Sequence, residues 1–170
     1  TGDRNSHQRN LSPNPEPSTL NPGPPMRETA FMEIVKQIHE KDPQYDIEAY
    51  LFVREALDYT IKMLQKPDKG SDRHVSGREL LEGLRRYAIE EFGPIALKTL
   101  EIWGITKTDD IGAIVFNLVQ AGEFGKTDED KSEDFANGYD FHDAFAKPFL
   151  PATPPDDTST PAGTRPKKRS

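Results

Sequence analysis

The pattern of hydrophobic and polar positions predicts a run of amphipathic helices through the middle of the chain. Apolar residues recur there at the i, i+3, i+4 and i+7 spacing that places them on one helix face. The first helix is predicted from about Arg27 to Lys41, and Pro43 ends it. The second begins at Asp46, a favourable N-cap residue, and continues to about Gln65. Because its apolar arc is wide, we expect this second helix to lie at the centre of the core.

Turn and capping residues delimit three further helices. Ser76 starts a capping-box pattern at the head of a helix predicted over Gly77–Phe92. A glycine-proline pair then ends this helix and begins a short one, Pro94–Trp103, because proline is tolerated at the first helical position. The last predicted helix covers Asp109–Ala121 and carries its apolar residues on one face.

The helical spacing ends after residue 122. We expect Glu123–Thr127 and Gly138–His142 to pair as a two-stranded ribbon around the acidic loop Asp128–Asp134. A shorter hairpin centred on Asn137-Gly138, a favoured tight-turn dipeptide, is the alternative. The aromatic residues that we expect to fold back onto the helices are Phe124, Phe135, Tyr139, Phe141, Phe145 and Phe149. The predicted fold is mostly α: a five-helix single domain with a small C-terminal β-hairpin, winged-helix-like in its order of elements.

Composition sets the limits of this domain. Of the 170 residues 34% are hydrophobic, below the roughly 45–50% of a globular domain, a figure that includes glycine. The deficit lies in two Pro-rich ends, so we expect disordered tails at residues 1–25 and 151–170 and a helical domain at 26–150. Met26 and Met32 are both candidate starts of the natural chain. We expect the basic end Arg165–Arg169 to be solvated.

Charge and cysteine usage narrow the function classes. The formal net charge is −7, and residues 26–150 hold 16 Lys and Arg against 25 Asp and Glu. Such a field repels phosphate backbones and attracts basic partners, so nucleic acid is disfavoured, although a local basic patch stays an option. Without cysteine there are no disulfides, thiolate nucleophiles or Cys-based zinc sites. With no apolar run of membrane-spanning length and no signal-peptide core, we expect a cytoplasmic protein with no membrane contact.

Three phrases between Ser76 and Phe135 carry a family resemblance: SGRELLEG, FGPIALKTLEIWGI and GKTDEDKSEDF. Through them the chain resembles a family of small uncharacterised proteins of planctomycete and verrucomicrobial bacteria. The likeness covers about Met32 to Phe149 and leaves both tails outside. It implies a bacterial, cytoplasmic protein, and it implies no activity, substrate or site residue.

Candidate chemistry is sparse. His74 and His142 flank structured elements, but no pair of histidines has a metal-ligand spacing within one helix turn, so we expect no metal and no cofactor. There is no nucleophile elbow and no phosphate-binding glycine loop. The acidic loop lacks the sixth-position glycine and final glutamate of an EF-hand, so we expect a solvated loop. A docking surface for a basic partner and a loose cation site are the alternatives for Asp128, Asp130, Glu133 and Asp134.

A winged helix would read DNA with its last helix, yet no Arg or Lys occurs between Asp109 and Phe124. The compact basic feature of the domain is Arg85-Arg86, and clustering with Arg78 and Arg73 would favour nucleic-acid binding. We expect Trp103, the lone tryptophan, to lie in the core; partial exposure would make it an interface hot spot.

These observations favour a small protein–protein interaction or regulatory module that is not an enzyme and needs no cofactor, with a homodimer as one option. A winged-helix-type nucleic-acid-binding regulator is the alternative. An enzyme would need His74 or His142 to meet carboxylates in a real pocket. The candidate interaction residues are His74, Arg78, Arg85, Arg86, Trp103, Asp128, Asp130, Glu133 and Asp134.

Overall fold

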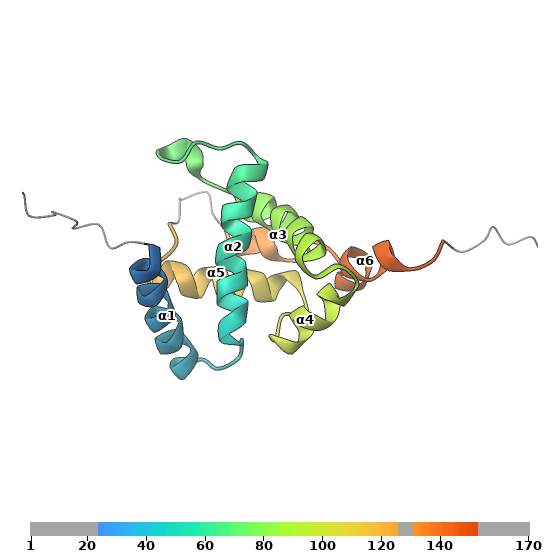
Figure 1. The fold of residues 1–170 in the computed structure, drawn as a ribbon, viewed down its shortest axis with the longest axis horizontal. Coiled ribbons are helices and arrows are strands. Elements are labelled where there is room, and N and C mark those ends of the chain that lie inside the picture. Colours follow the sequence, from blue (N-terminus) through green and yellow to red (C-terminus); the bar gives the residue numbers. More distant parts are fainter. Residues whose placement is uncertain (1–23, 126–130, 153–170) are drawn as a thin grey trace, which may run out of the picture.

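The computed structural model describes residues 24–125 and 131–152, and this part of the chain is mostly helical. Helix α2 (Ile47–Met63) runs through the middle, between α1 (Pro24–Lys41) and α3 (Gly77–Phe92) (Figure 1). Helix α5 (Thr108–Gln120) crosses behind α2 in this view. The remaining α-helices, which lie together beyond the C-terminal end of α3, are α4 (Ala96–Ile102) and α6 (Phe141–Phe145). Four 3₁₀ turns connect or extend them: η1 (Ser71–Arg73), η2 (Gly93–Ile95), η3 (Ser132–Phe135) and η4 (Lys147–Phe149).

The caps predicted from the sequence set the starts of two central helices. The Asp46 side chain accepts a hydrogen bond from the Glu48 amide at 2.9 Å, which satisfies one of the unpaired donors at the head of α2. At the head of α3, Ser76 Oγ accepts from the Glu79 amide at 3.2 Å and the Glu79 carboxylate accepts from the Ser76 amide at 2.8 Å. The predicted capping box of α3 is therefore confirmed.

The core forms around α2, as its wide apolar arc predicts. Tyr50 and Val53 of α2 are fully buried, and every neighbouring helix contributes side chains to the same cluster. Helices α2 and α3 meet closely at Thr60 and Gly83: a Cβ on Gly83 would lie 1.8 Å from Thr60 Oγ1. The hydroxyl of this buried threonine donates to the Ala56 carbonyl at 2.6 Å, so it is satisfied inside its own helix. Glycine is thus required sterically at the crossing.

The prediction of a C-terminal hairpin is wrong. No strand occurs in residues 24–125 or 131–152, so the winged-helix-like architecture is also overturned. The segment expected to pair as Gly138–His142 instead leads into α6, because Asp140 caps that helix by accepting from the Asp143 amide at 3.0 Å. Asn137 does adopt the left-handed backbone expected of a turn, with φ 52°, but the turn joins η3 to α6.

Aromatic anchors explain why this segment is not extended. Phe135, Phe141 and Phe145 are all buried in the core. The short helices η3 and α6 carry them, Phe135 in η3 and the other two in α6. The expectation that the aromatic residues fold back is confirmed for these three and for Phe124 and Tyr139, which are partly buried against the core, while Phe149 is exposed. Local hydrogen bonds inside η3 and α6 replace the ladder that a hairpin would have supplied.

Several boundaries also differ from prediction. Helix α1 begins at Pro24, inside the segment predicted to be a tail, and the short helix Pro94–Trp103 is divided into η2 and α4. The rest of the predicted tails lies outside the described residues, except Pro151 and Ala152. Asp128 and Asp130 of the acidic loop also lie outside them.

Candidate functional site

Two surfaces of the domain combine apolar and charged side chains, and they lie on opposite sides of α2. Phe52 and Tyr59 share one helix face, whereas Leu57 and Ile61 share the face about half a turn away. We call the first surface the acidic aromatic face; it is formed by Tyr59, Tyr87, Phe92 and Trp103 with Glu55, Glu90 and Glu91. We call the second the cleft; it is the hollow between α2, α5 and η3.

The cleft has a volume of about 800 Å³ and an apolar floor. Its apolar lining comes from α2, from α5 and from the segment after α5: Leu57, Ile61, Val115, Phe116, Val119 and Phe124. The polar rim comes from η1 and η3 with their neighbouring residues: Ser71, Arg73, His74, Lys131, Glu133 and Asp134. The structure therefore brings the predicted residues His74, Glu133 and Asp134 to one hollow.

Helix α5 lines the cleft with a second apolar stripe. Ile111, Ile114 and Leu118 point into the core and have no exposed surface. Val115, Phe116 and Val119 form a neighbouring stripe on the cleft wall, and Phe116 keeps 50% of its surface exposed. Gly112 allows η3 to pack closely on α5, because a Cβ at this position would lie 2.8 Å from the Cβ of Phe135.

The charged groups of the rim are balanced. Arg73 pairs with Asp58 at 3.8 Å and also donates to the Asp68 carbonyl. Lys131 and Glu133 are both exposed, and Lys131 has no ion-pair partner among the residues that the structure describes. Lys66 links the rim to α3: it donates a hydrogen bond to the His74 carbonyl at 2.6 Å and forms an ion pair with Glu79 at 3.3 Å.

The rim brings a histidine and two carboxylates to the same hollow, which is the condition that an enzyme would have to meet. In the described ranges, however, no group of three His, Asp or Glu side chains is placed to hold a metal ion. His142, the other candidate, is exposed on α6 and is not among the residues that line the cleft. His74, Glu133 and Asp134 therefore line one cavity, but they are not arranged to bind a metal ion.

Five aromatic rings form a continuous strip on the other side of α2. The ring centroids of Tyr59 and Tyr87 are 5.3 Å apart, and Tyr87 stacks on Phe52 at 5.4 Å. Phe52 continues to Phe92 at 5.6 Å and to Trp103 at 5.5 Å. Phe52 is buried and the other four are half-buried. The prediction that Trp103 lies in the core is correct for one side of its ring, which packs on Phe52 and Phe92, while its other surface is partly exposed.

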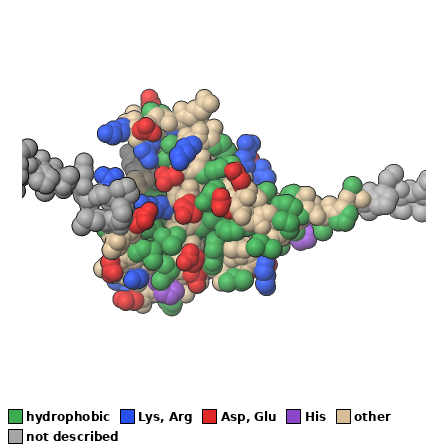
Figure 2. Space-filling view, viewed as in Figure 1, with side chains coloured by type: hydrophobic (Ala, Val, Ile, Leu, Met, Phe, Trp, Pro, Cys, Tyr) green, Lys and Arg blue, Asp and Glu red, His purple; other side chains and the backbone are tan. Residues whose placement is uncertain are grey.

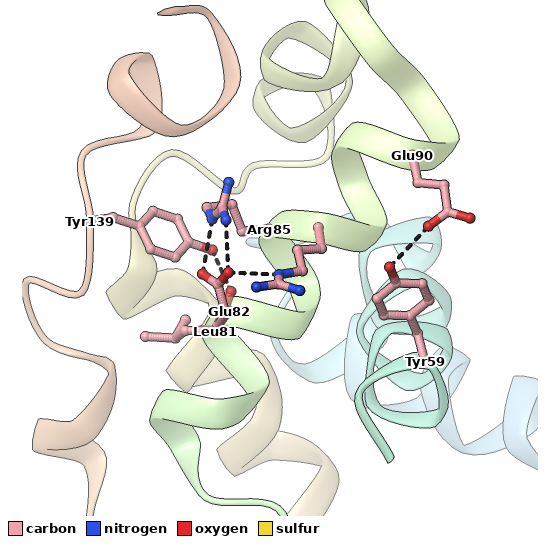
Figure 3. Close-up of polar contacts among 7 residues, drawn as sticks. Tyr59, Leu81, Glu82, Arg85, Glu90 and Tyr139 are labelled. Atoms are coloured by element: carbon pink, nitrogen blue, oxygen red, sulfur yellow. Dashed lines mark hydrogen bonds and ion pairs between the residues drawn. The ribbon is translucent and has the colours of Figure 1, made fainter. Parts of the chain in front are cut away.

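Glutamates of both helices bind the tyrosines of the strip in a crossed arrangement. Tyr59 of α2 donates to Glu90 of α3 at 2.9 Å, and Tyr87 of α3 donates to Glu55 of α2 at 2.9 Å; Figure 3 shows the first pair. Hydrogen bonding to Glu90 raises the pKa of Tyr59. Burial, followed by the hydrogen bond to Glu55 and the nearby charges of Glu91 and Glu90, raises the pKa of Tyr87. The strip therefore lies in a negative field.

Two glutamates of this face lie at the C-terminal end of α3, where they interact unfavourably with the helix dipole. The last turn of α3 holds Glu90 and Glu91 and no basic residue, although a helix C-terminus favours cations. Beyond it, Ile95 and Ile102 at the two ends of α4 are 62% and 69% accessible. Figure 2 shows acidic side chains among hydrophobic ones over the middle of the molecule, where α2 runs. Arg86 lies near Tyr59 but is ion-paired with Glu82.

The predicted basic residues of α3 are partly neutralised. Arg78, Arg85 and Arg86 fall at i, i+7 and i+8 on one face of the helix, with Glu82 between them. Glu82 accepts hydrogen bonds from Arg85 at 2.7 Å and from Arg86 at 2.8 Å. These bonds, chiefly those from Arg85, lower the pKa of Glu82 to about 2. Tyr139 lies beside this group and donates to the Leu81 carbonyl at 3.0 Å, which holds the C-terminal segment on α3 (Figure 3).

His74, Glu133, Asp134 and Trp103 were predicted from the sequence as candidate residues, but Tyr59, Tyr87 and the wall of the cleft were not. Tyr59 and Tyr87 are far apart in sequence and carry no motif, so nothing in the local pattern pairs them with glutamates. The wall is signalled by α5, whose apolar residues outnumber what one buried stripe needs. The sequence predicts one apolar face for this helix, whereas the structure has two apolar stripes on it.

Comparison with protein-family models, with curated proteins and with solved structures finds no match for this chain. The bacterial family resemblance drawn from the sequence therefore stays a prediction. Across residues 24–125 and 131–152, none of the helices combines the length and the apolar character that crossing a bilayer requires.

Proposed function

We propose that this domain is a cytoplasmic protein-interaction module that docks a basic segment of a partner protein on the acidic aromatic face. The observation that carries the proposal is the last turn of α3. Glu90 and Glu91 stand there beside half-exposed rings, where the helix dipole disfavours carboxylates. Glu90 is bound by Tyr59, but the Glu91 side chain has no hydrogen bond or ion pair among the residues that the structure describes, and places where a sequence breaks a local rule in this way are typical of functional sites.

The chemistry of the face suits lysine and arginine side chains. Their aliphatic stems can cover Phe92 and Trp103, while their charged ends reach Glu90 and Glu91. A cation over an aromatic ring adds about 0.5–1 kcal/mol at an exposed site. Tryptophan and tyrosine are also the residue types enriched at binding hot spots. The negative charge of residues 26–150 would speed the encounter with such a partner.

Affinity capture of the tagged full chain from a lysate of its source organism tests the proposal. We expect Glu90→Lys/Glu91→Lys to abolish retention of basic partner proteins, because the field at the strip is reversed. The matched control is Glu33→Lys/Glu123→Lys, which makes the same change in net charge at exposed positions that belong to neither the strip nor the cleft lining. We expect this control to retain the partners, and retention to fall as salt rises.

The charge reversal separates binding from folding. Lysines at the end of α3 suit the dipole, by about 0.3–1 kcal/mol each. This gain offsets the loss of the exposed Tyr59–Glu90 hydrogen bond, about 0.5 kcal/mol, so the binding-defective variant should be no less stable than wild type. Loss of partners from both variants alike would contradict the proposal, since it would reflect net charge alone. Recovery of nucleic acid, or loss of all partners after nuclease treatment, would replace it with a nucleic-acid function.

A further inference from the structure

The cleft has the dimensions of a small-molecule site. Its volume of about 800 Å³ lies within the roughly 300–1,000 Å³ of ligand pockets. Segments from α2, η1, α3, α5 and η3 all contribute to its walls, so a molecule inside it would be enclosed from several sides. We infer that the cleft binds an uncharged, largely apolar small molecule, which is a function separate from partner docking on the opposite side of α2.

The apolar stripe of α5 supports an apolar ligand. Phe116 and Val119 lie outside the core cluster that α5 fills with its other stripe, and Val115 packs against the edge of that cluster while also lining the cleft. Phe116 in particular leaves half of its surface open at the wall of the cleft. Covering such surface gains about 25 cal/mol for each Å² removed from water. A ligand that lies along α5 would gain this contribution from all three side chains.

The charges of the rim indicate that the ligand is uncharged. Among the described lining residues, Arg73 and Lys131 are matched by Glu133 and Asp134, so these four side chains together carry no net charge. An anion or a cation would lose its hydration without a surplus of opposite charge to replace it. The hydroxyl group of Ser132 lies at the rim, where it can orient one polar end of the molecule.

Fluorescence titration of the full chain with N-phenyl-1-naphthylamine tests the inference directly. This probe is uncharged and apolar, and its emission rises when it leaves water. 8-Anilinonaphthalene-1-sulfonate has the same aromatic skeleton with an added sulfonate, so the two probes differ mainly in charge. We expect saturable binding of the neutral probe at one site, at least about fivefold tighter than binding of the sulfonate.

Two pairs of variants place the probe in the cleft. Val119→Trp adds bulk at the wall and should weaken binding by about tenfold or more, whereas Gln120→Trp, an exposed neighbour, should change it less than about twofold. Phe116→Ala removes apolar lining and should weaken binding about threefold, with Ile102→Ala as the exposed control away from the cleft. Because Phe116 is half exposed, its truncation keeps the test valid even if the tryptophan variant does not fold.

Each contrary result overturns the inference. Absence of saturable binding of the neutral probe, or equal binding by wild type and Phe116→Ala, would show that the cleft does not hold it. Tighter binding of the sulfonate would assign the cleft to an anion. A dimer in light scattering that Val119→Trp converts to a monomer would assign the cleft to a second copy of the chain.

Discussion

The two sides of α2 treat apolar surface in different ways. On the acidic aromatic face the rings of Tyr59, Tyr87 and Trp103 pack against other rings, and all three residues are half-buried. In the cleft, Val115 and Phe116 face a hollow. The first surface is filled and charged, which suits a broad charged partner; the second is concave and electrically balanced, which suits a compact neutral molecule. The same helix thus separates two kinds of recognition.

The crossing of α2 and α3 supports both surfaces, and breaking it should have the largest effect. Gly83→Ala would place a methyl group 1.8 Å from Thr60 Oγ1 and force the helices apart. We expect a loss of about 3 kcal/mol in the free energy of unfolding, measured by urea denaturation, together with loss of binding at both surfaces. Gly125→Ala, whose added Cβ meets no atom within 4 Å, is the control and should change stability by less than about 0.5 kcal/mol. A stable Gly83→Ala variant would refute the close crossing.

A change at Gly112 should separate the two surfaces. Gly112→Ala would bring a Cβ within 2.8 Å of Phe135 and displace η3 from the cleft wall. We expect a loss of about 1 kcal/mol, since the better helix propensity of alanine offsets part of the strain, and several-fold weaker binding of the neutral probe. The emission of Trp103 reports the other side of α2 and should stay unchanged. A shift in that emission would mean that the two surfaces are coupled.

The smallest effect is expected at the crossed tyrosine–glutamate pairs. Tyr87→Phe removes the hydrogen bond to Glu55 and should reduce stability by about 0.5 kcal/mol near pH 7, because the pair is exposed. The pKa of Tyr87 is raised in the folded state, so its contribution is complete below about pH 10 and is lost as the pH rises further. Urea midpoints from pH 7 to 11 should therefore fall more steeply for wild type than for the variant. Parallel curves would contradict the raised pKa.

Local signals in the sequence were sufficient to predict helices α1 to α5, but not α6. Asp46 and Ser76 cap the helices they were predicted to cap, and the apolar spacing gave α2 its place at the centre. The hairpin failed because Asn137-Gly138 signals a turn but does not specify the type of element after the turn. Whether Phe141 lies in a strand or a helix depends on the core positions open to it and to Phe145, which only the packed helices define.

The candidate site divides in the same way. His74, Glu133 and Asp134 were recognisable as isolated chemical groups, but their meeting at one rim depends on the segments around η1 and η3 lining the same cleft. Tyr59 and Tyr87 drew no attention because the glutamates that bind them belong to the opposite helix. Residues that act together across two elements leave no spacing in the sequence to detect.

The sequence by itself determined helices α1 to α5 and the caps of α2 and α3, because each depends on contacts between residues a few positions apart. The negative charge and the excess of apolar residues on α5 follow directly from the residues present. Tertiary structure alone decided that α2 and α3 cross at Gly83, that the C-terminal aromatics enter the core from short helices, and that the surplus apolar stripe lines a cleft. These outcomes depend on the shape left between packed elements, and that shape exists only after the whole domain has condensed.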